Sequence, residues 1–109
     1  MGLRVSPLAS EMTAAAAEAL GDKWPDVRDF AKGEFRKIAA DIVLIDRLQE
    51  KGRISAERAK LHLEVQKNAS RTVLLAVEGL GVLAVEKAIN AALGAVRDAV
   101  NTALGFALL

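Results

Sequence analysis

The segment from Val82 to Leu109 restricts the possible folds of this chain more than any other part of the sequence. On a helical wheel of about 100° per residue, its polar side chains gather in one arc of about 120°. A ridge of large aliphatic side chains and a strip of small side chains fill roughly 200° of the remaining circumference, whereas a surface helix needs an apolar stripe of only about 100°. We therefore expect this helix to require neighbours on two sides.

The small side chains of this segment recur at spacings of three and four residues, so a second backbone could approach closely along the strip. We predict that the ridge and the strip form an interface with another copy of the chain or with a protein partner. The predicted interface residues are Gly81, Ala84, Val85, Ala88, Ile89, Ala92, Leu93, Ala95, Val96, Ala99 and Val100.

Two helices are predicted before this region. The first opens at Ser6, which suits a helix N-cap, and ends at Gly21. The second begins at Trp24–Asp26, where Pro25 fits the first helical turn, and runs to about Lys51. Apolar residues recur along it at three- and four-residue steps, which predicts one buried side.

The stretch Lys51–Ser55 predicts a tight turn between two antiparallel helices. Gly52 suits a left-handed C-terminal cap, and Ser55 suits the N-cap of the next helix. Few residues remain to connect the two helices, so they should pack against each other. The third helix is expected to run from Ala56 to at least Val77.

The stretch Glu78–Gly81 has two readings. A turn there would begin a separate fourth helix at Val82 and close a four-helix bundle, which would make association unnecessary. A turn would also expose Leu80, and no Pro, Asn, Asp or Ser marks it. The sequence therefore favours one long helix, of which about 27 residues, or about 40 Å, would project beyond the second helix and need covering by other subunits.

Composition limits the class of protein. A chain of 109 residues has room for a single helical domain over 1–109, and 52% hydrophobic but only 4% aromatic content suits close helix packing. Fifteen Lys and Arg against fourteen Asp and Glu argue against a dedicated nucleic-acid binder. The N-terminal residues lack the apolar stretch of a secretory signal, so we expect a cytoplasmic protein.

A membrane location is less favoured. The segment Thr72–Leu109 is rich in apolar residues, but it is interrupted by Glu78, Glu86, Lys87, Arg97 and Asp98. Charges at the centre of a span are costly, which argues against a transmembrane helix. Association of an amphipathic helix with a membrane surface remains an alternative.

Glu78 is the charged residue that looks misplaced, because on a continuous helix it would lie within the aliphatic ridge. A buried carboxylate needs a partner or a proton. We predict a buried ion pair of Glu78 with Arg28 or Lys32. The alternative is that Glu78 serves a ligand site or handles a proton.

No catalytic or metal-binding pattern stands out. His62 is the only histidine, and Glu34 and Asp41 lack the paired Glu-x-x-His motifs of helical di-metal sites. We interpret His62 as a boundary residue and expect Lys37 to pair with Glu34 and Asp41.

The sequence predicts an all-α protein: a long antiparallel helical hairpin with a short N-terminal helix and a long apolar C-terminal helix, assembled as a homo-oligomer or with a protein partner. We expect a structural, assembly or adaptor protein rather than an enzyme, with no cofactor, metal or nucleic acid. The two alternatives are a membrane-surface amphipathic protein and a small ligand-binding bundle that uses Glu78.

Overall fold

The computed structural model describes residues 2–109, and this part of the chain is helical and contains no β-strand. The all-α fold predicted from the sequence is therefore confirmed. The elements in chain order are α1 (Val5–Leu20), the short 3-10 helix η1 (Gly21–Lys23), α2 (Trp24–Glu50), α3 (Ala56–Leu75) and α4 (Val82–Leu104).

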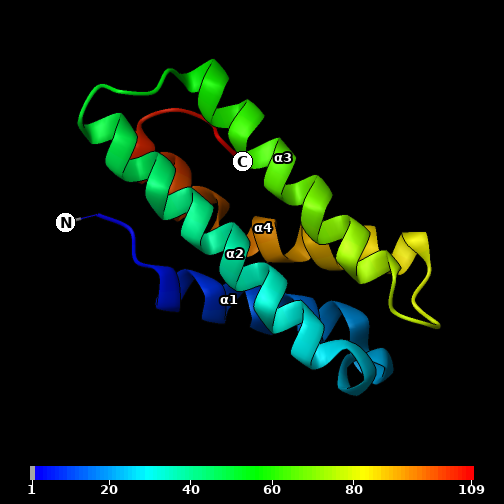
Figure 1. Ribbon diagram of the computed structural model, residues 1–109. Coiled ribbons are helices and arrows are strands. Elements are labelled where there is room, and N and C mark those ends of the chain that lie inside the picture. The colour runs from blue at the N-terminus through cyan, green and yellow to red at the C-terminus, as the bar shows by residue number, and fades with distance from the viewer. Residues whose placement is uncertain (1) are drawn as a thin grey trace.

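The N-terminal helix α1 lies between α2 and α4. It packs most extensively against α4 and next most against α2. On the other side of α2, α3 runs beside it in the opposite direction (Figure 1). Met12 and Ala16 of α1 are fully buried, as are Phe35 and Ile38 of α2. The short first helix thus supplies the middle of the core.

The connection from α2 to α3 has the caps that the sequence predicted. Gly52 takes a φ of +66°, its N–H bonds the carbonyl of Gln49, and the N–H of Arg53 bonds the carbonyl of Leu48. These two bonds define a Schellman motif. The hydroxyl of Ser55 accepts the N–H of Arg58 at 3.2 Å and caps α3.

The prediction of one continuous helix through Glu78–Gly81 is wrong. α3 ends at Leu75, and Gly79 takes a φ of +83°, a left-handed conformation that glycine adopts without strain. Leu80 is only 7% exposed, so the turn does not leave this side chain in water. A residue in a turn can point its side chain back into the core, and Leu80 does so here.

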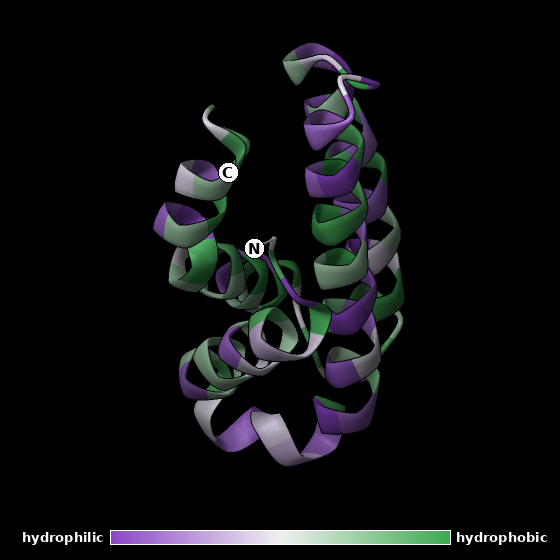
Figure 2. Cartoon of the chain, turned by 90° about the vertical axis from the view of Figure 1, so that its left-hand side faces the viewer, coloured by the Kyte–Doolittle hydropathy of each residue, from purple (hydrophilic) through white to green (hydrophobic). Residues whose placement is uncertain are grey.

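Since α4 is a separate helix, it folds back over the rest of the chain. Apart from Val82 and Leu83 at its start, its larger apolar side chains are buried, and α1 packs most extensively against it; Figure 2 shows hydrophobic residues on the inward sides of the helices. The Cα radius of gyration is 13.6 Å, close to the value of about 13 Å expected for a compact chain of this length. The C-terminal residues therefore do not project beyond the second helix, as the prediction of one long helix required.

Partly buried hydrogen bonds fasten both ends of the described chain. Asn101 Oδ1 accepts the N–H of Leu108 at 2.9 Å and of Leu109 at 3.0 Å, which folds the tail onto the end of α4. Near the N-terminus, the buried Asp46 accepts the N–H of Leu3 at 3.0 Å. Neither role is visible in the sequence, because each depends on how the helices pack.

Candidate functional site: a cationic groove between the first two helices

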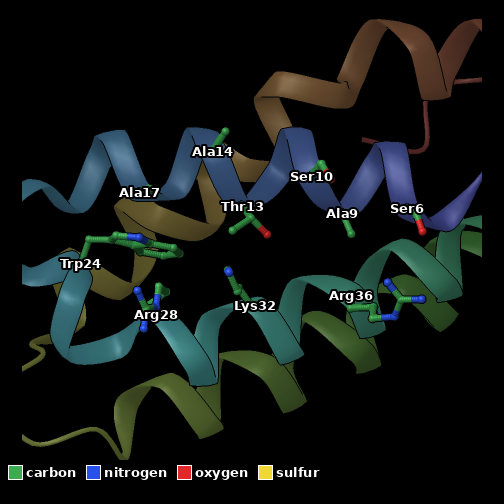
Figure 3. Close-up of a pocket in the computed structure, with 10 residues that line it drawn as sticks. All are labelled: Ser6, Ala9, Ser10, Thr13, Ala14, Ala17, Trp24, Arg28, Lys32 and Arg36. Atoms are coloured by element: carbon green, nitrogen blue, oxygen red, sulfur yellow. The ribbon is translucent and has the colours of Figure 1, made fainter.

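A groove of about 580 Å³ separates the outer edges of α1 and α2 (Figure 3). α2 contributes an aromatic ring and three cationic side chains, whereas α1 contributes only small and hydroxyl-bearing side chains. The lining residues are Ser6, Ala9, Ser10, Thr13, Ala14 and Ala17 of α1, and Trp24, Arg28, Lys32 and Arg36 of α2. No acidic side chain is among them.

The α2 wall is a single row of side chains. Trp24, Arg28, Lys32 and Arg36 follow one another at four-residue steps, and residues at that spacing lie one above the other on the same face of a helix. With a rise of about 1.5 Å per residue, the row extends over about 18 Å. It therefore presents an aromatic ring at one end and positive charge along the rest.

The α1 wall brings hydroxyl groups opposite this row. Thr13 points toward α2 and faces Lys32, and Ser6 lies across from Arg36 (Figure 3). We predicted Ser6 as the N-cap of the first helix, but α1 begins at Val5 with Arg4 in the capping position, and no side chain caps it. The hydroxyl of Ser6 is thus free to line the groove.

The groove cations are poorly neutralised. Arg28 lies 3.5 Å from Asp29, and both side chains are exposed to solvent. Within residues 2–109, Lys32 and Arg36 form no ion pair. Like charges four residues apart on a helix destabilise it by about 0.2–0.5 kcal/mol per pair. The row thus carries repulsion that the chain itself does not relieve.

This combination of groups suits the binding of anions. Guanidinium and ammonium groups make short, charge-assisted hydrogen bonds to phosphate and carboxylate oxygens, and hydroxyl groups add further donors. The lining offers cations and hydroxyl groups and contains no carboxylate.

The predicted buried ion pair is wrong. Arg28 and Lys32 do lie together, but they face the groove, whereas Glu78 is exposed in the turn after α3 and pairs with neither. The prediction assumed that α3 continued through Glu78, which would have placed the carboxylate on a buried ridge. Because the helix ends before it, Glu78 can remain in water.

The predicted interface of α4 is largely occupied within the chain. Val85, Ala88, Ile89, Ala92, Leu93, Val96 and Val100 are buried in the core, and Ala84 is partly buried. Gly81, Ala95 and Ala99 are exposed. Burial of the ridge by α1 removes the physical argument that required other subunits.

The remaining polar clusters have structural partners. Lys37 pairs with Glu34 at 3.0 Å as predicted, but Asp41 does not share Lys37 and instead contacts His62 Nδ1 at 2.7 Å. Across α3 and α4, Arg71 Nε bonds Glu86 Oε1 at 2.6 Å. In the described part of the chain, no three His, Cys, Asp or Glu side chains form a group that could hold a metal ion.

The groove was missed in the sequence, although one of its walls can be found there. The four-residue repeat Trp24, Arg28, Lys32 and Arg36 places three cations and the only tryptophan on one line of a helix. Nothing in the sequence states that the hydroxyl-bearing edge of α1 lies opposite this line. That juxtaposition depends on the short connection Gly21–Lys23, which turns α2 back along α1.

In comparisons with known proteins, no family model, curated protein or solved structure matches this chain. Within residues 2–109, no helix combines the length and the apolar content that crossing a membrane requires.

Proposed function

We propose that this protein binds a phosphate-bearing polyanion in the groove between α1 and α2. The observation that carries the proposal is the row of Arg28, Lys32 and Arg36, which lines a groove without a single acidic residue. The proposal keeps the ligand-binding alternative that the sequence left open. It moves the site from Glu78, in the turn after α3, to the groove between α1 and α2.

The spacing of the cations favours a ligand with several anionic groups in a row. Each four-residue step moves the attachment point by about 6 Å along the helix, so a row of anionic groups matches the three side chains better than a single phosphate group does. A chain of linked phosphates could contact them in succession, while the hydroxyls of Ser6 and Thr13 donate from the other wall. Its charge would also relieve the repulsion along the row.

Isothermal titration calorimetry with tripolyphosphate tests this proposal. We expect saturable binding that weakens as salt is added, because ions screen the exposed charges. Lys32→Gln and Arg36→Gln should each weaken binding about fivefold to tenfold, the effect of losing one charge-assisted hydrogen bond of about 1–1.4 kcal/mol. Neither change should lower the stability of the fold, because neither cation has an ion-pair partner in residues 2–109.

Arg58→Gln is the matched control. Arg58 is an exposed cation on α3, outside the groove, so its loss removes the same charge from the molecule without touching the proposed site. An equal loss of tripolyphosphate affinity in Arg58→Gln and Lys32→Gln would mean that the anion responds only to net charge. That result, or no binding by the unaltered protein, would refute the proposal.

Self-association is a second candidate function, at a different surface from the one first predicted. Val82 and Leu83 at the start of α4 are 62% and 87% exposed, and Leu75 at the end of α3 is 39% exposed. These residues flank the α3–α4 turn and give the molecule an apolar corner. An isologous dimer formed at this corner would cover the same side chains on both copies.

Size-exclusion chromatography with light scattering tests the second candidate. A dimer at this corner should have twice the 11.6 kDa mass of the chain, and Leu83→Asp should return it to the monomer. Ala107→Asp, an exposed apolar residue near the other end of α4, is the control and should leave the mass unchanged. A monomeric unaltered protein at high concentration would exclude the dimer.

A further inference from the structure

We propose that the ligand of the groove is a nucleoside polyphosphate, whose base stacks on Trp24 and whose phosphates lie along Arg28, Lys32 and Arg36. This inference rests on the proposed polyanion site and specifies its ligand. It is drawn from the order of the lining side chains, in which the aromatic ring stands at one end of the row and the cations follow it.

Trp24 is placed to receive a flat ligand. It is the first residue of α2, it is only partly buried, and its indole ring lies at the end of the groove between the two helices (Figure 3). Ala17 lies across from it on α1, so the groove-lining neighbour on that side of the ring is a small side chain, and Trp24 also packs against the hydrophobic core. An aromatic face of this kind stacks on nucleobases of any sequence.

The order of groups also fixes the direction of the ligand. The base would occupy the end nearest Trp24, the first phosphates would meet Arg28 and Lys32, and the terminal phosphate would reach toward Arg36 and Ser6. The sequence has no glycine-rich phosphate loop, so the phosphates would be held by side chains rather than by backbone amides.

The same geometry predicts an unusual response to magnesium. Mg²⁺ bound to the phosphates would neutralise part of the charge that the cations recognise. Protein sites that accept a magnesium–nucleotide complex usually hold the metal through carboxylates, and none lines this groove. We therefore expect the metal-free nucleotide to bind more tightly than its magnesium complex.

Calorimetric titration with adenosine triphosphate and with tripolyphosphate separates the base from the phosphates. We expect adenosine triphosphate to bind about tenfold more tightly than tripolyphosphate, because stacking of one base on an aromatic ring contributes about that factor. Since Trp24 is the only tryptophan and the chain has no tyrosine, its fluorescence should change with adenosine triphosphate and report directly on the proposed contact.

Trp24→Leu should remove the preference for adenosine triphosphate over tripolyphosphate. Trp24→Phe keeps an aromatic ring and should retain most of the preference, which guards against a variant that simply folds poorly. Phe106→Leu, an aromatic residue outside the groove, is the matched control and should keep both affinities.

The outcomes distinguish the two proposals. Equal affinity for adenosine triphosphate and tripolyphosphate in the unaltered protein would overturn the nucleotide inference and leave the polyanion site standing. A preference that survives in Trp24→Leu would overturn it as well. If neither compound binds, the polyanion site fails, and the nucleotide inference fails with it.

Discussion

At the scale of single residues, the groove cations are distinguished by their alignment on one face of α2 and not by the lack of an ion-pair partner, because within residues 2–109 Arg58 and Lys60 form no ion pair either. Arg71 and Lys37 each contact a carboxylate, at 2.6 Å and 3.0 Å. Lys32 and Arg36 have no such partner in residues 2–109, although they stand on a helix with another cation four residues away. We propose that a bound anion would contact both of these cations, which the titrations described above test.

Asp41 and His62 show the opposite case, a polar pair with a structural role. The Asp41 side chain is only 9% exposed, and its Oδ1 atom contacts His62 Nδ1 at 2.7 Å. Its Oδ2 atom is buried and has no hydrogen-bond partner within residues 2–109, where His62 is therefore the one polar partner of this carboxylate. The pair joins α2 to α3.

We expect His62→Ala to lower the free energy of unfolding by about 1 kcal/mol, because it leaves a nearly buried carboxylate without its hydrogen bond. Urea denaturation followed by circular dichroism measures the change. Lys60→Ala, an exposed neighbour on α3 with no ion pair, is the control and should alter the stability far less. Equal effects of the two changes would contradict the assigned role.

At the scale of the helices, local signals predicted the turns that depend on local chemistry. Gly52 and Ser55 form the caps expected of them, because the cap bonds join residues close in sequence. The end of α3 was missed, because the sequence does not show that Leu80 packs against the core after the turn. That contact depends on residues distant in sequence, and the helix pattern around Leu80 does not show it.

In the candidate site, too, the sequence predicts the part that lies within one helix and does not predict the part that depends on helix packing. The row of cations beside Trp24 can be read from a four-residue repeat, since it lies within one helix. The opposing hydroxyls of Ser6 and Thr13 become part of the site only when α1 packs beside α2. A sequence reading could therefore find one wall of the groove but not the groove.

Two glycine substitutions test the assigned turn. Gly79→Ala should destabilise the protein by about 1–2 kcal/mol, because a Cβ atom is strained at its φ of +83°. Gly94 lies exposed within α4, with no atom within 4 Å of the added Cβ. Gly94→Ala should stabilise the protein by about 0.5–1 kcal/mol. Thermal or urea denaturation gives both values, and a stabilising Gly79→Ala would favour the continuous helix.

At the scale of the whole molecule, the central difference between expectation and structure concerns what covers α4. The sequence predicts that α4 has a wide apolar arc. It does not show whether residues of the same chain or of another chain cover this arc. In the structure, α1 covers the apolar arc of α4, and it packs along α4 more extensively than along α2. The expectation that other subunits cover this arc assumed that the C-terminal residues project beyond the second helix, whereas α4 is a separate helix that packs on α1.

A matched pair of alanine substitutions separates internal cover from subunit contact. Ala92 is fully buried against the rest of the chain, so Ala92→Asp should cost more than about 3 kcal/mol and largely unfold the monomer. Ala95 lies on the exposed side of α4, and Ala95→Asp should change stability by less than about 1 kcal/mol. Circular dichroism reports unfolding, and light scattering reports mass. A folded Ala92→Asp variant with a reduced mass would instead support the interface first predicted.

The location of bound anion is the most direct test of the groove, and a two-dimensional ¹H–¹⁵N NMR titration with tripolyphosphate measures it residue by residue. We predict that the largest shifts fall on the groove-lining parts of α1 and α2, around Thr13, Arg28 and Lys32. Arg53 and Arg58, the cations near the α2–α3 turn, should shift little. The largest shifts at that turn, or small shifts spread evenly over all exposed cations, would contradict the account.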